Sequence, residues 1–286
     1  MSADSENARP KLAIIAGGGS APRHLIETCR RLGRDVFVVC LEGQADTDLA
    51  KDAPHAWLPL GAGTRLKQIV EEQQLKEAVM IGSVKRPSIF ELKPDLLALK
   101  VVMKAGINRA GDDTLLRGIG KAIEQETGMR VIGVQDVFAD LLMPEGQLGR
   151  HAPNEEALSD IARGIEAAQA LGRLDIGQAA VVQQGIVLVV EAAEGTDALI
   201  LRCAGLRREG PGGVLVKTAK PQQDNRFDLP TIGPDTITVA AKAGLRGVAL
   251  EAGRSLLIER EKTIALANDA GLFILGIVPA KEKPDA

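Results

Sequence analysis

The stretch KLAIIAGGGSAP, at residues 11–22, decides how the chain begins to fold. A short apolar run ends in three consecutive glycines and Ser20, after which Pro22 opens an amphipathic stretch that continues to Leu32. The apolar run predicts a buried strand, the glycines predict a tight loop, and the amphipathic stretch predicts a helix. A strand, a glycine loop and a helix in this order indicate the first unit of a parallel sheet.

The alternation of apolar strands with helices continues through the first half of the chain. Further strands are predicted at 35–41, 56–60, 77–81 and 130–133, and helices at 64–74, 95–104 and 114–127. Because helices then cover both faces of a parallel sheet, we expect an N-terminal Rossmann-like domain over residues 11–142. The polar residues 1–10 are expected to be disordered, and the Gly- and Pro-containing residues 143–153 are expected to be a linker and hinge between domains.

The second half predicts a C-terminal α/β catalytic domain over residues 154–280. A helix at 155–171 precedes a hairpin at 180–191, and Thr196 is placed to cap a further helix. Strands and helices then alternate to residue 278, interrupted by an irregular polar segment, KPQQDNRFDLPTIG, from Lys220 to Gly233. The predicted fold class is therefore α/β, with an N-terminal Rossmann-like parallel-sheet domain and a C-terminal α/β catalytic domain.

Composition excludes several classes of protein. The net charge of −3 and an aromatic content of 2% provide neither the basic surface nor the stacking side chains that nucleic-acid binding needs.

Cys29, Cys40 and Cys203 are far apart and lie in apolar stretches, which indicates buried thiols in a reducing compartment. With no signal peptide and no membrane span in the sequence, we expect a cytoplasmic protein whose membrane contact is peripheral.

Two loops in the first half are candidate phosphate sites. In the glycine loop, Gly18, Gly19 and Ser20 could offer backbone amides to a phosphate, although the glycines could equally serve the turn alone. Pro22 stands where a dinucleotide fingerprint needs its third glycine, so NAD is not predicted.

The second loop, GSVKRP at residues 82–87, places Ser83, Lys85 and Arg86 at the carboxyl end of a predicted strand. The basic pair suits a phosphate but could also be merely solvated. Asp112 is a further candidate, for which helix capping by the Asp-Asp-Thr group is the competing interpretation.

Polar residues of the second domain form the strongest candidate site. They fall near predicted strand ends and in the polar segment: Glu191, Thr196, Asp197, Lys217, Lys220, Gln223, Asp224, Arg226 and Asp228. Carboxylates gathered with amines suit Mg²⁺-assisted phosphoryl transfer, which depends on positioning and on neutralising oxygen charge. Surface salt bridges and helix caps are the alternative, but they leave the long polar segment without a purpose.

Other chemistries lack their motifs. The three histidines have neither H-x-x-x-H nor D-x-H spacing, so the sequence does not support a zinc or two-metal phosphoesterase centre. The sequence also contains no G-x-S-x-G elbow and no C-x-x-C pair, which removes support for serine hydrolase and thiol-redox chemistry.

Four strings together resemble the LpxI-type UDP-2,3-diacylglucosamine pyrophosphatases. They are AGGGSAP at 16–22, GSVKRP at 82–87, EGTDALI at 194–200 and KTAKPQQDNRFDLPTIGPDTI at 217–237. The resemblance extends from about residue 11 to residue 278. One departure is Ala21, because the family more often has a larger apolar residue before the proline.

The resemblance implies hydrolysis of UDP-2,3-diacylglucosamine to UMP and 2,3-diacylglucosamine 1-phosphate in lipid A biosynthesis, with attack on the phosphorus nearer the sugar. It also implies a Mg²⁺ cofactor and a homodimer. Because the candidate ligands are all oxygen atoms, Mn²⁺ is an expected substitute, and because the product is an amphiphile we expect peripheral contact with the inner membrane. Carried over by position, the catalytic residues are Asp224, Lys217, Lys220 and Arg226, with Gln223 and Asp228 beside them. The expected metal ligands are Asp224, Glu191 and Asp197.

Two other functions remain open at this point. One is a nucleotide-sugar transferase or dehydrogenase that uses the first domain for a cofactor, and the other is a nucleotide-binding module without catalysis.

Overall fold

The computed structural model describes residues 9–84, 94–99, 112–227 and 229–279, which form two compact units. The first unit runs to Val137 and also includes the segment that begins at Asp224. The second unit runs from Phe138 to Gln223 and resumes at Leu229. A stretch from the second half of the sequence therefore packs with the first half.

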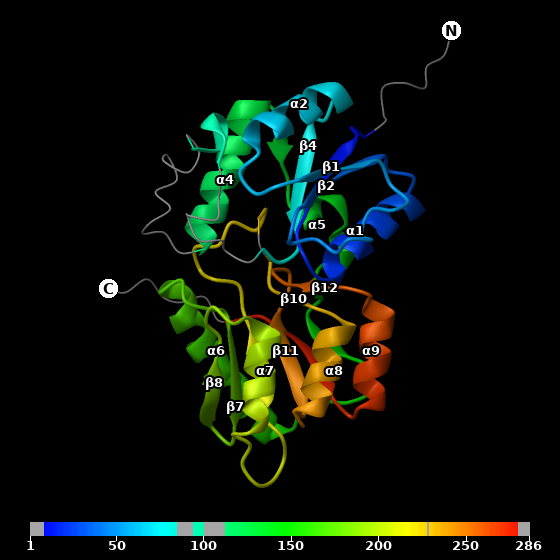
Figure 1. Ribbon diagram of the computed structural model, residues 1–286. Helices are drawn as coiled ribbons and strands as arrows, with labels where there is room; N and C mark the ends of the chain where they lie inside the picture. Colours follow the sequence, from blue (N-terminus) through cyan, green and yellow to red (C-terminus); the bar gives the residue numbers. More distant parts are fainter. Residues whose placement is uncertain (1–8, 85–93, 100–111, 228, 280–286) are drawn as a thin grey trace. The chain divides into compact units, whose positions relative to one another are not determined.

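The first unit is built on a parallel sheet with the strand order β3-β2-β1-β4-β5, of which Figure 1 labels β1, β2 and β4. Its strands are β1 (Leu12–Ala16), β2 (Val36–Leu41), β3 (His55–Leu58), β4 (Glu77–Ile81) and β5 (Arg130–Val131). Its helices include α1 (Ser20–Arg31), α2 (Gly63–Gln73), α4 (Asp112–Thr127) and the short α5 (Val134–Val137). The order reverses direction between β1 and β4, as in the Rossmann arrangement.

Burial explains the central place of β1 in this sheet. All five of its residues are buried, because strands lie on both sides of it and helices cover the sheet. Ile69 of α2 packs with Ile15 and Val39 in one cluster, while Leu25 of α1 is fully buried. The predicted order of strand, glycine loop and helix is confirmed.

The second unit contains a mixed sheet with the strand order β6-β13-β11-β9-β7-β8. The strands are β6 (Gly146–Leu148), β7 (Ala179–Gln183), β8 (Ile186–Val190), β9 (Val214–Lys217), β11 (Gly247–Glu251) and β13 (Phe273–Ile277). The central strands β9, β11 and β13 are parallel, whereas β7 is antiparallel to both β8 and β9. The hairpin expected near residues 180–191 is thus β7–β8.

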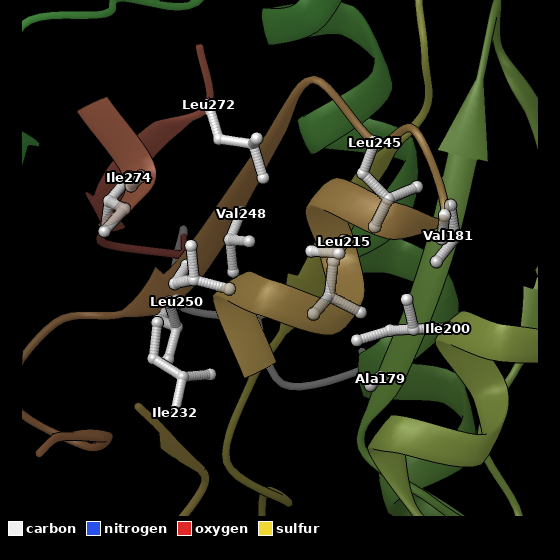
Figure 2. Packing of buried hydrophobic residues seen from close by; sticks show 14 of the residues in the cluster. Ala179, Val181, Ile200, Leu215, Ile232, Leu245, Val248, Leu250, Leu272 and Ile274 are labelled. Carbon is white, nitrogen blue, oxygen red and sulfur yellow. The ribbon is translucent and has the colours of Figure 1, made fainter. Parts of the chain in front are cut away.

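Helices pack on both faces of this sheet. Helix α6 (Glu155–Arg173) covers one face through Ile161, which packs against Val216 and Ala249. The other face carries α7 (Thr196–Ala204), α8 (Pro234–Lys242) and α9 (Arg260–Asp269). Figure 2 shows this larger core, which includes Leu215 of β9, Val248 of β11 and Ile200 of α7. Strand alternation sends successive residues to opposite faces, as an α/β sandwich requires.

Residues 143–153, expected to be a linker, contain β6 at Gly146–Leu148, which pairs with β13 at the edge of the second sheet. Because of this backbone pairing, the segment belongs to the second unit rather than forming a separate linker. Its Gly and Pro residues had favoured a loop in the sequence. A 3-10 turn at Ala139–Leu141 precedes it. A separate small sheet pairs β10 (Thr231–Ile232) with β12 (Leu256–Leu257).

Candidate functional site

Three strands of the second sheet run in the same direction and end in polar residues. Glu191 directly follows β8, Lys217 is the last residue of β9, and Glu251 is the last residue of β11. Each is at most 9% exposed. Because the carboxyl ends of such strands meet at one edge of the sheet, charged groups collect there. Buried charges need polar partners, and these define the site.

Glu191, Thr196 and Lys217 form one continuous network. The Lys217 ammonium donates to Thr196 Oγ1 at 2.8 Å and to the Thr231 carbonyl at 3.4 Å. The Thr196 hydroxyl donates to Glu191 Oε1 at 2.6 Å, and the backbone N–H of Gln178 donates to Glu191 Oε2 at 3.0 Å. The hydroxyl therefore links an ammonium to a carboxylate that is itself held by backbone.

The beginning of α7 determines the position of Thr196 in this network. Gly195, rather than Thr196, occupies the N-cap position, with a φ of 82° that only glycine adopts readily. Thr196 is instead the first helical residue, so the expectation that it caps the helix is wrong. Asp197 follows in the first turn and is exposed.

Lys220 belongs to a second network in the same unit. Its ammonium pairs with Asp175 in an ion pair whose side chains are 8% and 17% exposed. Its backbone N–H donates to Gln223 Oε1 at 2.9 Å, and its carbonyl accepts from the N–H of Gln223. Asp175 was not anticipated; it has a φ of 55°, and Asp is one of the few side chains that adopt this left-handed conformation.

Glu251 and Arg254 hold the backbone that leads to Lys220. Glu251 Oε2 accepts from the N–H of Ala219 at 2.8 Å, and Glu251 Oε1 accepts from Arg254 at 3.2 Å. Arg254 also donates to the Lys220 carbonyl at 3.3 Å. Sequence reasoning missed both residues, although the position of Glu251 at the end of an apolar strand was an available signal.

Asp224 and Arg226 lie in the first unit, where they form a bidentate ion pair. Arg226 Nη2 is 2.9 Å from Asp224 Oδ2, and Arg226 Nε is 3.1 Å from Asp224 Oδ1. This geometry is the strong form of the arginine–carboxylate interaction. The hydrogen bonds from Arg226 lower the pKa of Asp224 and outweigh the opposing effect of its partial burial, so Asp224 is ionised at neutral pH.

Contacts with α4 and β5 explain why this segment belongs to the first unit. Arg226 Nη1 lies 3.3 Å from Glu124 Oε1 and 3.5 Å from the Val131 carbonyl. Phe227 packs so closely on Gly120 of α4 that a Cβ atom there would lie 2.0 Å from the ring. The Arg226 guanidinium also stacks 4.8 Å from the centre of the Phe227 ring. The absence of a side chain at Gly120 thus leaves room for the Phe227 ring, on which Arg226 stacks.

The glycine loop of the first unit is joined to the loop after β4. The N–H of Gly18 donates to the Ser83 carbonyl at 2.8 Å, and the N–H of Ser83 donates back to the Gly18 carbonyl at 3.0 Å. A Cβ atom on Gly17 would lie 2.4 Å from the Ser83 carbonyl oxygen. The close approach of the two backbones accounts for Gly17. The Gly18 amide is occupied by its hydrogen bond to Ser83. Gly19, with a φ of 88°, is the N-cap of α1, which begins at Ser20.

The remaining expected residues are not placed in detail. Lys85, Arg86 and Asp228 lie outside the described residues. Asp112 begins α4, and the description does not extend to its side chain. The structure thus gathers Glu191, Thr196 and Lys217 in one network, Lys220 and Gln223 in a second, and Asp224 and Arg226 in a third.

The donor set for a divalent cation is sparse. Among the described residues, no three His, Cys, Asp or Glu side chains are grouped so that they could hold a metal ion. Both carboxylate oxygens of Glu191 already accept hydrogen bonds. Arg226 also occupies both carboxylate oxygens of Asp224, but the Asp224 side chain remains 26% exposed. Asp197, the third expected ligand, is exposed.

Two further observations bear on the expected properties of the chain. In the parts that the structure describes, no helix has the length and apolar character needed to span a bilayer. Cys29, Cys40 and Cys203 are fully buried as free thiols, and burial raises the pKa of Cys29 and of Cys40 to about 11. The expectation of buried thiols is confirmed.

Comparison with known proteins covers both units. Residues 11–141 match the family model described as the LpxI N-terminal domain, and residues 144–275 match the LpxI C-terminal domain. A relative from Caulobacter vibrioides, named UDP-2,3-diacylglucosamine pyrophosphatase LpxI, is 42% identical over 281 residues. That alignment covers 96% of this chain and 99% of the relative.

Similarity to solved structures is more distant. The Bordetella bronchiseptica enzyme WbmG, in complex with NAD and UDP, matches with 13% identity over 44% of this chain and 37% of its own, at a TM-score of 0.29. The Thermus thermophilus UDP-glucose 4-epimerase complex with NAD matches with 14% identity over 95% of this chain and 87% of its own, at a TM-score of 0.32.

Proposed function

The chain belongs to the LpxI family, and from this membership we propose that it hydrolyses the pyrophosphate bond of UDP-2,3-diacylglucosamine. The products would be UMP and 2,3-diacylglucosamine 1-phosphate, in a step of lipid A biosynthesis. One observation carries the proposal: a relative named for this activity aligns at 42% identity along 99% of its own length.

The geometry around Asp224 supports hydrolysis at a phosphorus atom. Asp224 stays ionised because Arg226 binds both of its carboxylate oxygens. An ionised carboxylate with a fixed orientation can accept a proton from an attacking water or hold that water in line. Arg226 adds positive charge beside Asp224, which pyrophosphate oxygens need while charge develops on them.

We propose Mg²⁺, with Mn²⁺ as a substitute, as the cofactor. Mg²⁺ keeps several of its waters and is commonly held by one or two carboxylates together with substrate phosphates, so it does not require a cluster of three protein ligands. Asp224 is the residue that would hold it. When bound, the cation neutralises negative charge on the pyrophosphate.

The linked loops of the first unit disfavour the dehydrogenase alternative. Dinucleotides bind where the strand order reverses, which in this sheet is between β1 and β4. The two hydrogen bonds between Gly18 and Ser83 join the loops at that point and occupy an amide that a pyrophosphate would need. Failure to bind NAD in a calorimetric titration is the expected result, and tight binding would favour the alternative.

Location and assembly complete the proposal. From the resemblance to the family we propose a cytoplasmic homodimer, and because the substrate is an amphiphile we propose that it acts at the inner-membrane surface. Sedimentation at working concentrations and co-flotation with anionic vesicles would test these two properties separately from activity.

The deciding experiment follows UMP release from UDP-2,3-diacylglucosamine by thin-layer chromatography. We expect release with Mg²⁺ and none in EDTA. Substrate binding without any UMP release under Mg²⁺ would instead favour a non-catalytic binding module. A matched preparation of Asp224→Ala controls for contaminating phosphatases.

A further inference from the structure

The two lysines at the edge of the second sheet have different partners. The ammonium of Lys220 is paired directly with Asp175, and both side chains are largely buried. Lys217 is only 6% exposed, yet within the described part of the chain no carboxylate lies within ion-pair distance of it. Its acceptors are a hydroxyl and a carbonyl, both uncharged.

A carboxylate still lies one hydroxyl away from Lys217. Thr196 Oγ1 accepts from the ammonium at 2.8 Å and donates to Glu191 Oε1 at 2.6 Å. A hydroxyl can do both at once because it has one proton and two lone pairs. In a partly buried chain of this kind, each hydrogen bond polarises the next, so Glu191 strengthens the hydrogen bond between Thr196 and Lys217.

We call the hydrogen-bonded chain Lys217–Thr196–Glu191 the relay, and backbone groups hold it at the Glu191 end. The N–H of Gln178 fixes Glu191 Oε2, and the backbone N–H of Glu191 donates to the Ala179 carbonyl at the start of β7. A Cβ atom on Gly177 would lie 2.2 Å from the Glu191 carbonyl oxygen, so the chain before β7 passes directly against this residue. These backbone contacts hold Glu191 in place.

From these contacts we propose that Glu191 is a positioning residue that acts on Lys217 through the Thr196 hydroxyl. The arrangement orients the ammonium at the end of β9 without neutralising it, which leaves its charge for a phosphate oxygen. A direct ion pair, as in Lys220–Asp175, would compete with that oxygen. The inference rests on the proposed function and gives Glu191 and Thr196 a role in positioning rather than in metal or substrate binding.

Paired variants at Thr196 test the relay. Thr196→Val removes the hydroxyl at nearly constant shape, whereas Thr196→Ser retains it. We expect Thr196→Val to lower kcat about tenfold or more with a smaller change in KM, because a misplaced charged group loses transition-state stabilisation. Thr196→Ser should recover most of that loss. Thr263→Val in α9, which removes a fully buried hydroxyl that donates to the Ile258 carbonyl before the helix, controls for a general loss of stability.

A double-mutant cycle separates a relay from two independent contributions. If Glu191 acts through Thr196, Glu191→Gln should lower kcat in the wild type but by less than about threefold in the Thr196→Val background, since the link is already cut. Multiplicative effects of the two substitutions would overturn the proposal. Equal kcat in Thr196→Val and Thr196→Ser would overturn it as well.

The ammonium of Lys217 provides a readout that does not depend on turnover. Buried, hydrogen-bonded lysine ammonium protons exchange slowly enough for a ¹H–¹⁵N spectrum, and Lys217→Arg assigns the signal. We expect the signal to persist in Thr196→Ser and to vanish in Thr196→Val. Its persistence in Thr196→Val, or its absence from the wild type, overturns the relay. Absence of UMP release from the wild type overturns only the proposed function, and the spectrum still decides whether the relay exists.

Discussion

Arg226 holds both carboxylate oxygens of Asp224, with Nη2 at 2.9 Å from Oδ2 and Nε at 3.1 Å from Oδ1. The same arginine reaches Glu124 of α4 at 3.3 Å, so the position of Asp224 depends on a helix that lies about one hundred residues earlier in the sequence. The carboxylate proposed for catalysis is thus fixed by the first unit.

Asp224→Ala should lower kcat by roughly 10²-fold or more with little change in substrate binding, as expected of a group that acts mainly in the transition state. Steady-state UMP release gives kcat, and calorimetric titration gives the affinity. Asp48→Ala, which removes an exposed partner of Arg23, is the matched control. A near-wild-type kcat in Asp224→Ala would remove Asp224 from the centre of the mechanism.

Arg226→Met should raise the pKa of Asp224 toward the ordinary value of 3.8, because the hydrogen bonds from Arg226 hold it lower in the wild type. The sign follows from the direction of the shift. The pair stabilises the fold above the unfolded-state pKa of an aspartate, and this stabilisation is lost as the pH falls through the lowered folded-state value. Carboxyl ¹³C NMR titration of both proteins measures the shift, and coinciding titration curves would contradict the prediction.

Gly120→Ala should displace Phe227, since the added Cβ atom would lie 2.0 Å from its ring. Replacing glycine by alanine inside a helix ordinarily stabilises by about 1 kcal/mol, so a lowered Tm together with a lowered kcat would identify the clash. Gly205→Ala, at the end of α7 where a Cβ atom meets nothing within 4 Å, is the control. Adding Phe227→Leu to Gly120→Ala should restore part of the loss; if it does not, the ring contact is not the cause.

Activity removed by EDTA should return with Mg²⁺ or Mn²⁺ and not with Zn²⁺. The candidate ligands are oxygen atoms, and the sequence has no histidine or cysteine pattern of the kind that zinc sites use. Metal-free protein titrated with each ion, with UMP release as the readout, tests this expectation. Full activity in EDTA would exclude a required divalent cation.

Hydrolysis in ¹⁸O water should place the label in the sugar-lipid phosphate. This follows if water attacks the phosphorus nearer the sugar and UMP leaves, as resemblance to the family implies. Mass spectrometry of both products reads the position of the label. Label in UMP would reverse the assigned direction of attack.

Much of the fold could be predicted because local patterns carry it. The apolar run before Gly17 became β1, and all five of its residues are buried as a central parallel strand requires. Strand β6 escaped prediction because three residues with Pro144 and Gly149 around them carry no periodic signal, and pairing with β13 alone makes them a strand.

The sequence by itself determined the family, the two α/β units and the choice of Lys217, Lys220, Asp224 and Arg226 as a group. Tertiary structure alone decided how these residues divide, since each buried charge must find a partner that can be distant in sequence. Lys217 is linked to Glu191 through Thr196, Lys220 is paired with Asp175, and Arg226 reaches Glu124. Sequence spacing cannot specify these partners, because they are set by which strand ends and helix faces the chain brings together on folding.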